Sequence, residues 1–399
     1  MDNTHQLPLI VEDYPASRPS LRIAVVTETW PPEVNGVAVT LAKLVQGLCL
    51  KNHDLQLIRP RQDKFDSAIR DSSLKEVLMR GMPIPHYPDL KLGFPSKKTL
   101  VKAWSVRRPD IVHIATEGPL GWSALQAAKV LKLPVTSDFR TNFQSYSKHY
   151  GLSWMRKPIV AYLRKFHNAT ACTMVPTKDL KFTLESNGFQ NLKVVSRGVD
   201  TQLFNAKKRD EALRATWQVT PNTVILISVG RMAPEKNLEQ VLATYEVLVA
   251  SGADVKLVLV GDGPMREQCK RRCPDAIFPG MLTQDKLAVY YASSDLFVFP
   301  SQSETFGNVT LEALASGLPV LAFDCAAAMD WVKPGVNGWL IPESNPEAFA
   351  AKAREVILTK GLLAQVSAST RNQLVQLDWC QISDQVEEVM LDAIKHHRY

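Results

Sequence analysis

Two glutamates lie eight residues apart in the stretch SETFGNVTLEALASG, on either side of a Phe-Gly-Asn. On one continuous helix their side chains would point about 80° apart and would share no face. If Gly307 instead separates a loop from a helix that begins near Asn308, Glu304 lies on the loop and Glu312 about one turn inside the helix. The unpaired amides of such a helix start, around Phe306, Gly307 and Asn308, would form a cradle for a diphosphate.

Each of the two glutamates could hold part of a nucleotide sugar around that cradle. Glu312 would accept two hydrogen bonds from the vicinal hydroxyls of a ribose, and Glu304 on the loop could contact a sugar. Glu312 lies in the apolar run VTLEALASGLPV, where a buried glutamate is rare unless it is paired or binds a ligand. The alternative for Glu312 is an ordinary glutamate of a helix.

Two further loops carry groups that suit a diphosphate. Arg231 and Lys236 stand five residues apart in VGRMAPEKNL, at the junction between a buried strand and a helix. Two cations that converge there can grip a diphosphate, and arginine can do so with two parallel hydrogen bonds. In TETWPPEVNGV, Gly36 directly precedes a helix whose free amides could face an anion. The alternatives are two solvated charges for the first loop and a simple tight turn for the second.

The elements that must position these residues alternate along the chain as strand, loop and helix. In the first half, predicted strands at LRIAVVTETW, DLQLIRP, DIVHIA, LPVTSDF and ATACTMVPT alternate with helical patterns such as VAVTLAKLVQGLCL. After VVSRGVDTQLFN (194–205) the alternation starts again, with predicted strands at TVILISVGR, VKLVLVGDG, DLFVFPS and LPVLAFD. This order predicts an α/β protein with two doubly wound, Rossmann-like domains. Ligands in such folds bind beyond the carboxyl ends of the strands, so we expect a cleft between the domains.

Length and composition agree with two domains. The chain has 399 residues, of which 45% are apolar and 22% charged, and it contains no run of about 18 apolar residues that could span a bilayer. We predict domains over residues 21–196 and 197–379, with a last helix at 380–399 that packs back on the first domain. The polar N-terminal stretch lacks a secretion-signal pattern and the cysteines are scattered, so we expect reduced thiols and a cytoplasmic location.

On these motifs the chain resembles the family-four retaining glycosyltransferases, which have the GT-B fold. The resemblance covers residues 21–399, and its most specific part is the pair of glutamates in SETFGNVTLEALASGLPV. The stretches GRMAPEKNL, SRGVDTQLF and WVKPGVNGWLI are similar to further signatures of that family. The resemblance implies that Arg231 and Lys236 neutralise the diphosphate of the sugar donor, with help from the amides near Gly36 and at 306–308.

The resemblance also assigns the rest of the donor. It implies that Glu312 holds the ribose and that Glu304 contacts the donor sugar. The stretch FPGML is similar to the segment whose backbone contacts the base, with Met281 as the expected contact.

The stretch PDIVHIATEGPLG is similar to one branch of that family, which contains bacterial mannosyl-, glucosyl- and sulfoquinovosyltransferases that make membrane glycolipids. That branch has Phe-His-Thr-Asn where this chain has Asp138-Phe139-Arg140-Thr141-Asn142, so Arg140 takes the place of the active-site histidine. An arginine cannot act as a base, but it can bind a phosphate or a sugar hydroxyl.

The resemblance implies transfer of a hexose from a nucleoside diphosphate sugar, GDP-mannose or a UDP-hexose, with retention at the anomeric carbon. The chain contains no Asp-x-Asp, so we expect no obligatory metal and no other cofactor. The expected acceptor is a membrane lipid such as diacylglycerol. A transferase for a soluble or polyprenyl-linked saccharide, and a sugar-nucleotide epimerase on the same fold, are the alternatives.

Basic charge in the first half points to an anionic membrane surface. The net charge is +7, and residues 91–165 alone contain fourteen Lys and Arg against three acidic residues. Two stretches, SKKTLVKAWSVRR (96–108) and WMRKPIVAYLRKFH (154–167), combine apolar and aromatic residues with cations, as helices that bind anionic lipid do. The alternative for each is a helix that packs on the core and has a solvated basic face. The aromatic residues are not arrayed for stacking on bases, so a peripheral membrane protein on the inner face is expected and a nucleic-acid partner is not.

Overall fold

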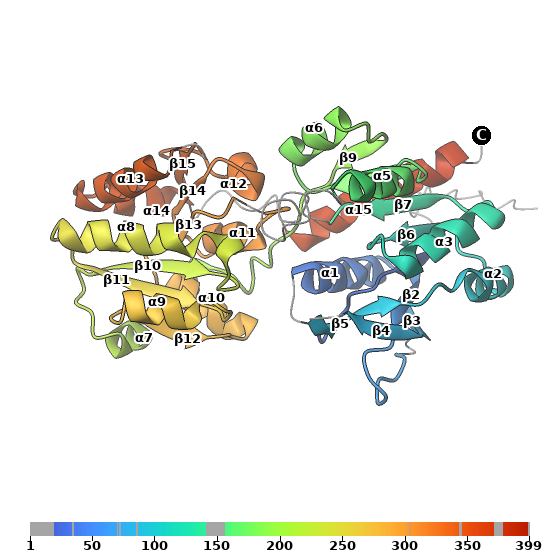
Figure 1. Ribbon diagram of the computed structural model, residues 1–399, viewed down its shortest axis with the longest axis horizontal. Coiled ribbons are helices and arrows are strands. Elements are labelled where there is room, and N and C mark those ends of the chain that lie inside the picture. The colour runs from blue at the N-terminus through green and yellow to red at the C-terminus, as the bar shows by residue number, and fades with distance from the viewer. Residues whose placement is uncertain are drawn as a thin grey trace, which may run out of the picture.

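The computed structural model contains two parallel β-sheets, one in each half of the chain (Figure 1). We call residues up to 196 the first half and residues 197–370 the second half. The structure describes residues 20–33, 36–69, 71, 73–84, 87–140, 156–302, 304–342, 345–370 and 378–397.

The sheet of the first half has the order β3-β2-β1-β6-β7-β8-β9 and is parallel throughout. Its strands are β1 (Arg22–Val26), β2 (Asp54–Pro60), β3 (Leu74–Met79), β6 (Ile111–Ile114), β7 (Val135–Asp138), β8 (Cys172–Val175) and β9 (Leu192–Val194). The other elements of this half are α1 (Gly36–Leu50), α2 (Lys97–Val106), α3 (Pro119–Val130), α5 (Arg156–His167), α6 (Lys178–Ser186) and the antiparallel hairpin of β4 (Gly81–Ile84) and β5 (Tyr87–Gly93).

The sheet of the second half has the order β12-β11-β10-β13-β14-β15 and is also parallel throughout. Its strands are β10 (Val224–Val229), β11 (Val255–Val260), β12 (Ile277–Gly280), β13 (Leu296–Phe299), β14 (Val320–Phe323) and β15 (Gly338–Ile341). Its helices are α7 (Glu211–Thr216), α8 (Leu238–Ala250), α9 (Arg266–Arg272), α10 (Gln284–Ala292), α11 (Asn308–Ala315), α12 (Ala326–Trp331), α13 (Pro346–Leu358) and α14 (Leu362–Thr370), together with the short 3-10 turns η2 (Ala206–Lys208) and η3 (Pro234–Lys236).

The central strands are buried along their whole length. Every residue of β6 and of β13 is buried, because helices cover both faces of each sheet. Such strands read as continuous apolar runs in the sequence instead of an alternating pattern. The predicted alternation of strands and helices, and the two mostly parallel sheets, are therefore confirmed. No pattern predicts the β4–β5 hairpin, because prolines at 83 and 88 interrupt its strands.

The last helix, α15 (Trp379–His397), packs on the first half of the chain (Figure 1, red). It shares one hydrophobic cluster with α1, formed by Leu41, Leu44, Val45, Leu48, Ile382, Val386, Val389, Met390 and Ile394. Beside this cluster Lys51 donates to Glu387 at 2.8 Å and also contacts Asp384. An apolar face and an ion pair thus hold α15 against α1.

Each of the two basic helices buries large aliphatic and aromatic residues, with the exception of Val106 and Tyr162, which are exposed. In α2, Leu100 is 1% exposed and Trp104 fully buried, and the indole nitrogen of Trp104 donates to Gln56 at 3.0 Å. In α5, Leu163 and Phe166 are buried in the same way. For these four side chains the hypothesis of a membrane contact is therefore wrong, whereas the lysines of α2 and Val106 at its last position (86% exposed) remain exposed. Tyr162 of α5 keeps 40% of its surface exposed, Trp154 lies outside the described residues, and no described helix is both long and apolar enough to cross a membrane.

Candidate functional site

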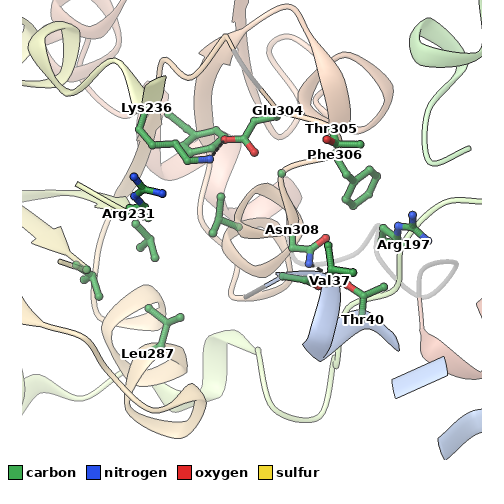
Figure 2. Close-up of a pocket in the computed structure, with 18 of the residues that line it drawn as sticks. Val37, Thr40, Arg197, Arg231, Lys236, Leu287, Glu304, Thr305, Phe306 and Asn308 are labelled. Carbon is green, nitrogen blue, oxygen red and sulfur yellow. Dashed lines mark hydrogen bonds and ion pairs between the residues drawn. The ribbon is translucent and has the colours of Figure 1, made fainter. Parts of the chain in front are cut away.

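A cavity of about 710 Å³ opens between the two halves, beyond the carboxyl ends of β10, β11 and β13 (Figure 2). In the second sheet β10 lies between β11 and β13, so the loops that follow these strands leave toward opposite sides. Such a switch point is where doubly wound folds bind ligands. Every predicted site residue except Glu312 lines this cavity: Gly36, Arg140, Arg231, Lys236, Met281, Glu304, Phe306, Gly307 and Asn308.

Two glycines shape the wall that the second half contributes. Gly230 and Gly261 follow the neighbouring strands β10 and β11, and both line the cavity. A Cβ atom at position 261 would lie 2.0 Å from the carbonyl oxygen of Gly230, and Gly261 has a φ of 131°. Only glycine lets the two loops run so close together. The next residue after Gly230, Arg231, therefore starts at the rim of the cavity, where half of its side chain is exposed.

The loop after β13 carries Glu304 and turns into α11 at Gly307. Gly307 has a φ of 89°, a left-handed conformation that favours glycine, and α11 begins at Asn308. The carbonyl oxygen of Phe306 accepts a hydrogen bond from the amide of Ala327 at 2.8 Å, which fixes the loop against α12. The predicted helix start at Asn308 is confirmed, and the first-turn amides of α11 lie at the cavity.

Lys236 and Glu304 point toward each other across this part of the cavity (Figure 2). The Nζ of Lys236 donates to the Oε1 of Glu304 at 2.5 Å, and the hydroxyl of Ser301 donates to the same oxygen at 2.9 Å. The side-chain amide of Asn237 donates to the carbonyl of Pro300 at 3.1 Å, so the two loops that carry Lys236 and Glu304 are tied together. The structure thus places a cation and a carboxylate next to the start of α11, within reach of one small ligand.

Glu312 lies one turn further along α11 and is half-buried. The hydroxyl of Tyr291, a fully buried residue of α10, donates to its Oε2 at 3.2 Å. Burial raises the pKa of Glu312 to about 7, and the hydrogen bond from Tyr291 opposes this shift only in part. Tyr291 is a partner that no local sequence pattern reveals, because it reaches Glu312 from another helix.

We expect Glu312→Gln to remove the part of the pH dependence of the free energy of unfolding that the titration of Glu312 causes. Between pH 4.5 and about 7 the folded protein keeps a proton on Glu312 that the unfolded chain has already lost. The free energy of unfolding of the wild type therefore falls as the pH rises through this window. Relative to the wild type, the variant should gain on the order of 1–3 kcal/mol in this free energy between pH 5 and pH 8, measured by urea denaturation. Glu267→Gln, at a glutamate that is 70% exposed, is the control, and curves for Glu312→Gln that run parallel to the wild type would contradict the assignment.

The wall on the other side of the cavity begins with α1. Gly36, Val37 and Thr40 of this helix line the cavity, and Gly36 is the predicted site residue among them. The side-chain amide of Asn308 donates to the hydroxyl of Thr40 at 3.3 Å, and that hydroxyl donates to the carbonyl of Gly36 at 2.6 Å. A chain of hydrogen bonds thus joins the start of α1 to the start of α11, and the two helix starts face the same cavity.

Arg140 lies on this wall as well, directly after β7, and forms an ion pair with Asp138 at the end of that strand. Arg197, from the SRGVD stretch after β9, lines the cavity beside it and approaches the same carboxylate at 3.5 Å. The SRGVD stretch is similar to a signature of the family, but the sequence alone assigns no role to Arg197. Its position after a strand in the same sheet as Arg140 is the signal that indicates a shared site.

The end of the cavity near α10 is apolar. Met281 follows β12, is 61% exposed, and lines the cavity together with Leu282, Leu287 and Val260. Apolar walls of this kind suit a nucleobase, while the backbone around Met281 supplies polar groups. Contact of Met281 with the base stays a prediction.

Two family models match the chain in succession. The model described as Glycosyltransferase Family 4 matches residues 34–203, and the model described as Glycosyl transferases group 1 matches residues 209–373. The boundary between them falls next to the junction of the two halves.

Relatives and solved structures agree with these matches. The chain is 33% identical over 347 residues to a GDP-mannose-dependent alpha-mannosyltransferase of Mycobacterium tuberculosis, which covers 84% of this chain and 89% of the relative. It is 29% identical over 321 residues to an alpha-monoglucosyldiacylglycerol synthase of Streptococcus pneumoniae, which covers 76% of this chain and 71% of the relative. Sucrose-phosphate synthase from Thermosynechococcus elongatus has a similar structure, with a TM-score of 0.77 and 18% identity over 94% of this chain and 100% of that one.

Proposed function

Because the chain belongs to the family-four glycosyltransferases and has their GT-B fold, we propose that it transfers a hexose, with retention, from a nucleoside diphosphate sugar to a membrane lipid. GDP-mannose or a UDP-hexose is the proposed donor, and diacylglycerol is the proposed acceptor. The relative from Mycobacterium tuberculosis depends on GDP-mannose, and that from Streptococcus pneumoniae is a synthase of monoglucosyldiacylglycerol. Both descriptions support a donor and an acceptor of these classes.

One observation carries the proposal: two cations and a helix start surround the cavity next to Glu304. In the proposed complex, Arg231, Lys236 and the first-turn amides of α11 hold the diphosphate of the donor. Glu304 contacts the sugar, and Glu312, deeper along the same helix, accepts hydrogen bonds from the ribose hydroxyls. The spacing of the two glutamates on either side of the helix start then follows the length of the nucleotide sugar.

The proposed reaction is a same-face displacement. The bond between the anomeric carbon and the leaving phosphate oxygen breaks as the acceptor oxygen bonds to that carbon, and the acceptor proton passes to the leaving phosphate. Negative charge grows on the diphosphate, so Arg231 and Lys236 stabilise the transition state more than the ground state. Arg140 cannot act as a base, and this scheme needs none from the protein.

The test is a donor panel with a lipid acceptor. The full chain is incubated with UDP-glucose, UDP-galactose, GDP-mannose and ADP-glucose, each with and without diacylglycerol vesicles. One GDP- or UDP-sugar should yield a glycolipid, and nuclear magnetic resonance should show that the anomeric configuration of the donor is kept. A product with inverted configuration, an epimerised donor without acceptor, or transfer only to a soluble saccharide would overturn the proposal.

We propose that transfer needs no divalent metal. Charge on the diphosphate is balanced by the two side-chain cations and the helix start, which do the work that a metal ion does in other transferases. Addition of EDTA should therefore change kcat/KM by less than about two-fold, whereas a metal that acts as the electrophile supplies several kcal/mol. A loss that added Mg²⁺ restores would contradict this prediction.

We propose that the lysines of α2 hold the protein on an anionic membrane. Lys97, Lys98 and Lys102 are exposed on this helix, while its Leu100 and Trp104 face the core. Each lysine near an anionic surface contributes about 1 kcal/mol, so changing all three to glutamine should weaken binding to phosphatidylglycerol vesicles by roughly 10- to 100-fold at low salt. Vesicle sedimentation measures the effect.

The matched control changes three exposed lysines of the second half in the same way: Lys286, Lys333 and Lys360. This control variant should bind the vesicles like the wild type. Equal binding by both triple variants would contradict the assignment of α2, and absence of binding by the wild type at low salt would remove the membrane proposal altogether.

A further inference from the structure

Two arginines converge on one carboxylate oxygen at the wall of the cavity that lies opposite Lys236. The Nη2 of Arg140 donates to the Oδ2 of Asp138, and the Nη1 of Arg197 lies 3.5 Å from the same oxygen. The Nε2 of His113 approaches this oxygen too, at 3.7 Å, which is longer than a hydrogen bond. A single carboxylate therefore serves two guanidinium groups.

Positive charge exceeds negative charge at this wall. The side chains of Arg140 and Arg197 are only 5% and 10% exposed. In the described part of the chain, Asp138 is the one carboxylate that forms an ion pair with either of them. Residues 141–155, which follow Arg140, contain Lys148 and neither Asp nor Glu. A buried cation without a counterion costs several kcal/mol, so the arrangement needs a compensating anion.

The hydrogen bonding of Arg140 and the pKa of Arg197 both agree with this excess of positive charge. The Nε of Arg140 is buried and has no hydrogen-bond partner among the described residues. Burial, together with the charge of Arg140, lowers the pKa of Arg197 to about 10. Buried donors in folded proteins are nearly always paired, so an unpaired donor at a cavity calls for an explanation, such as a bound ligand.

Both arginines line the same cavity as the predicted donor site. Arg231 and Lys236, the cations assigned to the diphosphate, come from the loops of the second half, and Figure 2 shows Arg197 well apart from them. Arg140 and Arg197 are thus a pair of cations that is separate from Arg231 and Lys236.

We propose that Arg140 and Arg197 form a second anion subsite, which binds a carboxylate, sulfonate or phosphate group of a substrate next to the reacting sugar. Guanidinium groups bind such planar or tetrahedral oxyanions with parallel hydrogen bonds, and the unpaired Nε of Arg140 offers one of these donors. Asp138 keeps the two groups side by side. The charge of the bound group neutralises the cation that Asp138 leaves uncompensated.

Either of the two substrates could carry this oxyanion. It is either the group at C6 of the donor sugar, as in a uronic or sulfonated sugar, or a charged group on the lipid acceptor. The identity of the substrate rests on the proposed function, but the existence of the subsite does not. Two experiments therefore test the two statements separately.

The first experiment needs no turnover. Thermal unfolding of the full chain is measured in sodium sulfate and in sodium chloride at equal ionic strength, with GDP and UDP present to occupy the diphosphate site. Sulfate stabilises proteins in general, and this effect is common to all variants. The midpoint temperature of unfolding should be higher in sulfate than in chloride. This difference should be several degrees larger for the wild type than for Arg140→Gln or Arg197→Gln. Arg22→Gln, at a 52% exposed arginine on the far end of β1, should behave like the wild type. An equal sulfate effect in all four proteins would overturn the subsite.

The second experiment identifies the source of the oxyanion. Substrates are compared in pairs that differ in one charged group: UDP-glucose with UDP-glucuronic acid, GDP-mannose with GDP-mannuronic acid, and diacylglycerol with phosphatidic acid. The wild type should prefer the charged member of one pair by at least about ten-fold in kcat/KM, the value of a charge-assisted hydrogen bond. Arg140→His, which restores the histidine of the similar branch, should abolish that preference, and Arg140→Lys should retain part of it.

The remaining outcomes are also decisive. A preference within a donor pair assigns the oxyanion to the sugar, and a preference within the acceptor pair assigns it to the lipid. Turnover without any preference would overturn the proposal. A loss of GDP or UDP affinity in Arg140→His as large as its loss of transfer would overturn it too, because the arginines would then be ligands of the diphosphate. If no pair is turned over at all, the proposed function fails and the sulfate experiment alone decides the subsite.

Discussion

Replacing Glu304 by alanine is expected to lower kcat/KM for sugar transfer by about 10³-fold, or about 4 kcal/mol of transition-state stabilisation. Glu304 is 12% exposed, and its Oε1 accepts hydrogen bonds from Lys236 and Ser301, so its carboxylate is fixed at the cavity. A carboxylate held this rigidly aligns the sugar for attack, and removing the carboxylate misplaces the anomeric carbon. The affinity for GDP or UDP should stay the same or rise, because Lys236 loses a competing carboxylate.

The measurements for this variant are steady-state transfer and calorimetric binding of the nucleoside diphosphate. Glu304→Gln keeps the shape of the side chain and one acceptor oxygen, so its loss of transfer should be smaller. Glu355→Ala, at a glutamate of α13 that is 54% exposed, serves as the matched control. If transfer and nucleotide binding fell to the same extent in Glu304→Ala, the assignment of Glu304 to the sugar would be wrong.

Lys236→Met is expected to lower transfer by about 10²- to 10³-fold and, unlike Glu304→Ala, to weaken nucleotide binding. The ammonium group lies next to the start of α11, where the diphosphate is proposed to bind, and its charge is most valuable as the leaving group forms. The long apolar side chain of methionine retains the packing of the lysine stem. Lys352→Met, at a lysine of α13 whose side chain is 31% exposed, provides the control with the same chemical change.

The double variant tests whether Lys236 and Glu304 act together. Their side chains are in contact at 2.5 Å, so the effects of the two single changes should not add. The loss of transfer in the double variant should be clearly smaller than the product of the two single losses. Full additivity would show that the contact has no part in the reaction.

Much of the donor side of the site could be predicted because its residues lie close together in the sequence. Gly307 and Asn308 indicate the start of a helix, and the loop before this helix must then place Glu304 next to its first turn. Arg231 and Lys236 likewise follow one strand, and a parallel sheet brings the ends of neighbouring strands to one edge. Local turn chemistry and strand order therefore suffice to gather these groups around one cavity.

The contacts that could not be predicted join residues that are distant in the chain. Tyr291 reaches Glu312 from α10, and Arg197 reaches Asp138 across the first sheet. Nothing in the local pattern of either segment fixes its partner, because the geometry depends on how helices and loops pack in three dimensions. The basic helices show a second limit: an amphipathic pattern is the same whether its apolar face meets a membrane or, as in α2, the core.

The return of α15 to the first half has a consequence for synthesis. Leu41 and Leu44 are made early, yet the side chains that cover them, among them Val386 and Met390, leave the ribosome only after the whole second half. An apolar face of the first half therefore stays uncovered while the entire second half is translated and can fold. The half that is synthesised first is the one whose core closes last, and a chain cut off before residue 379 leaves it open.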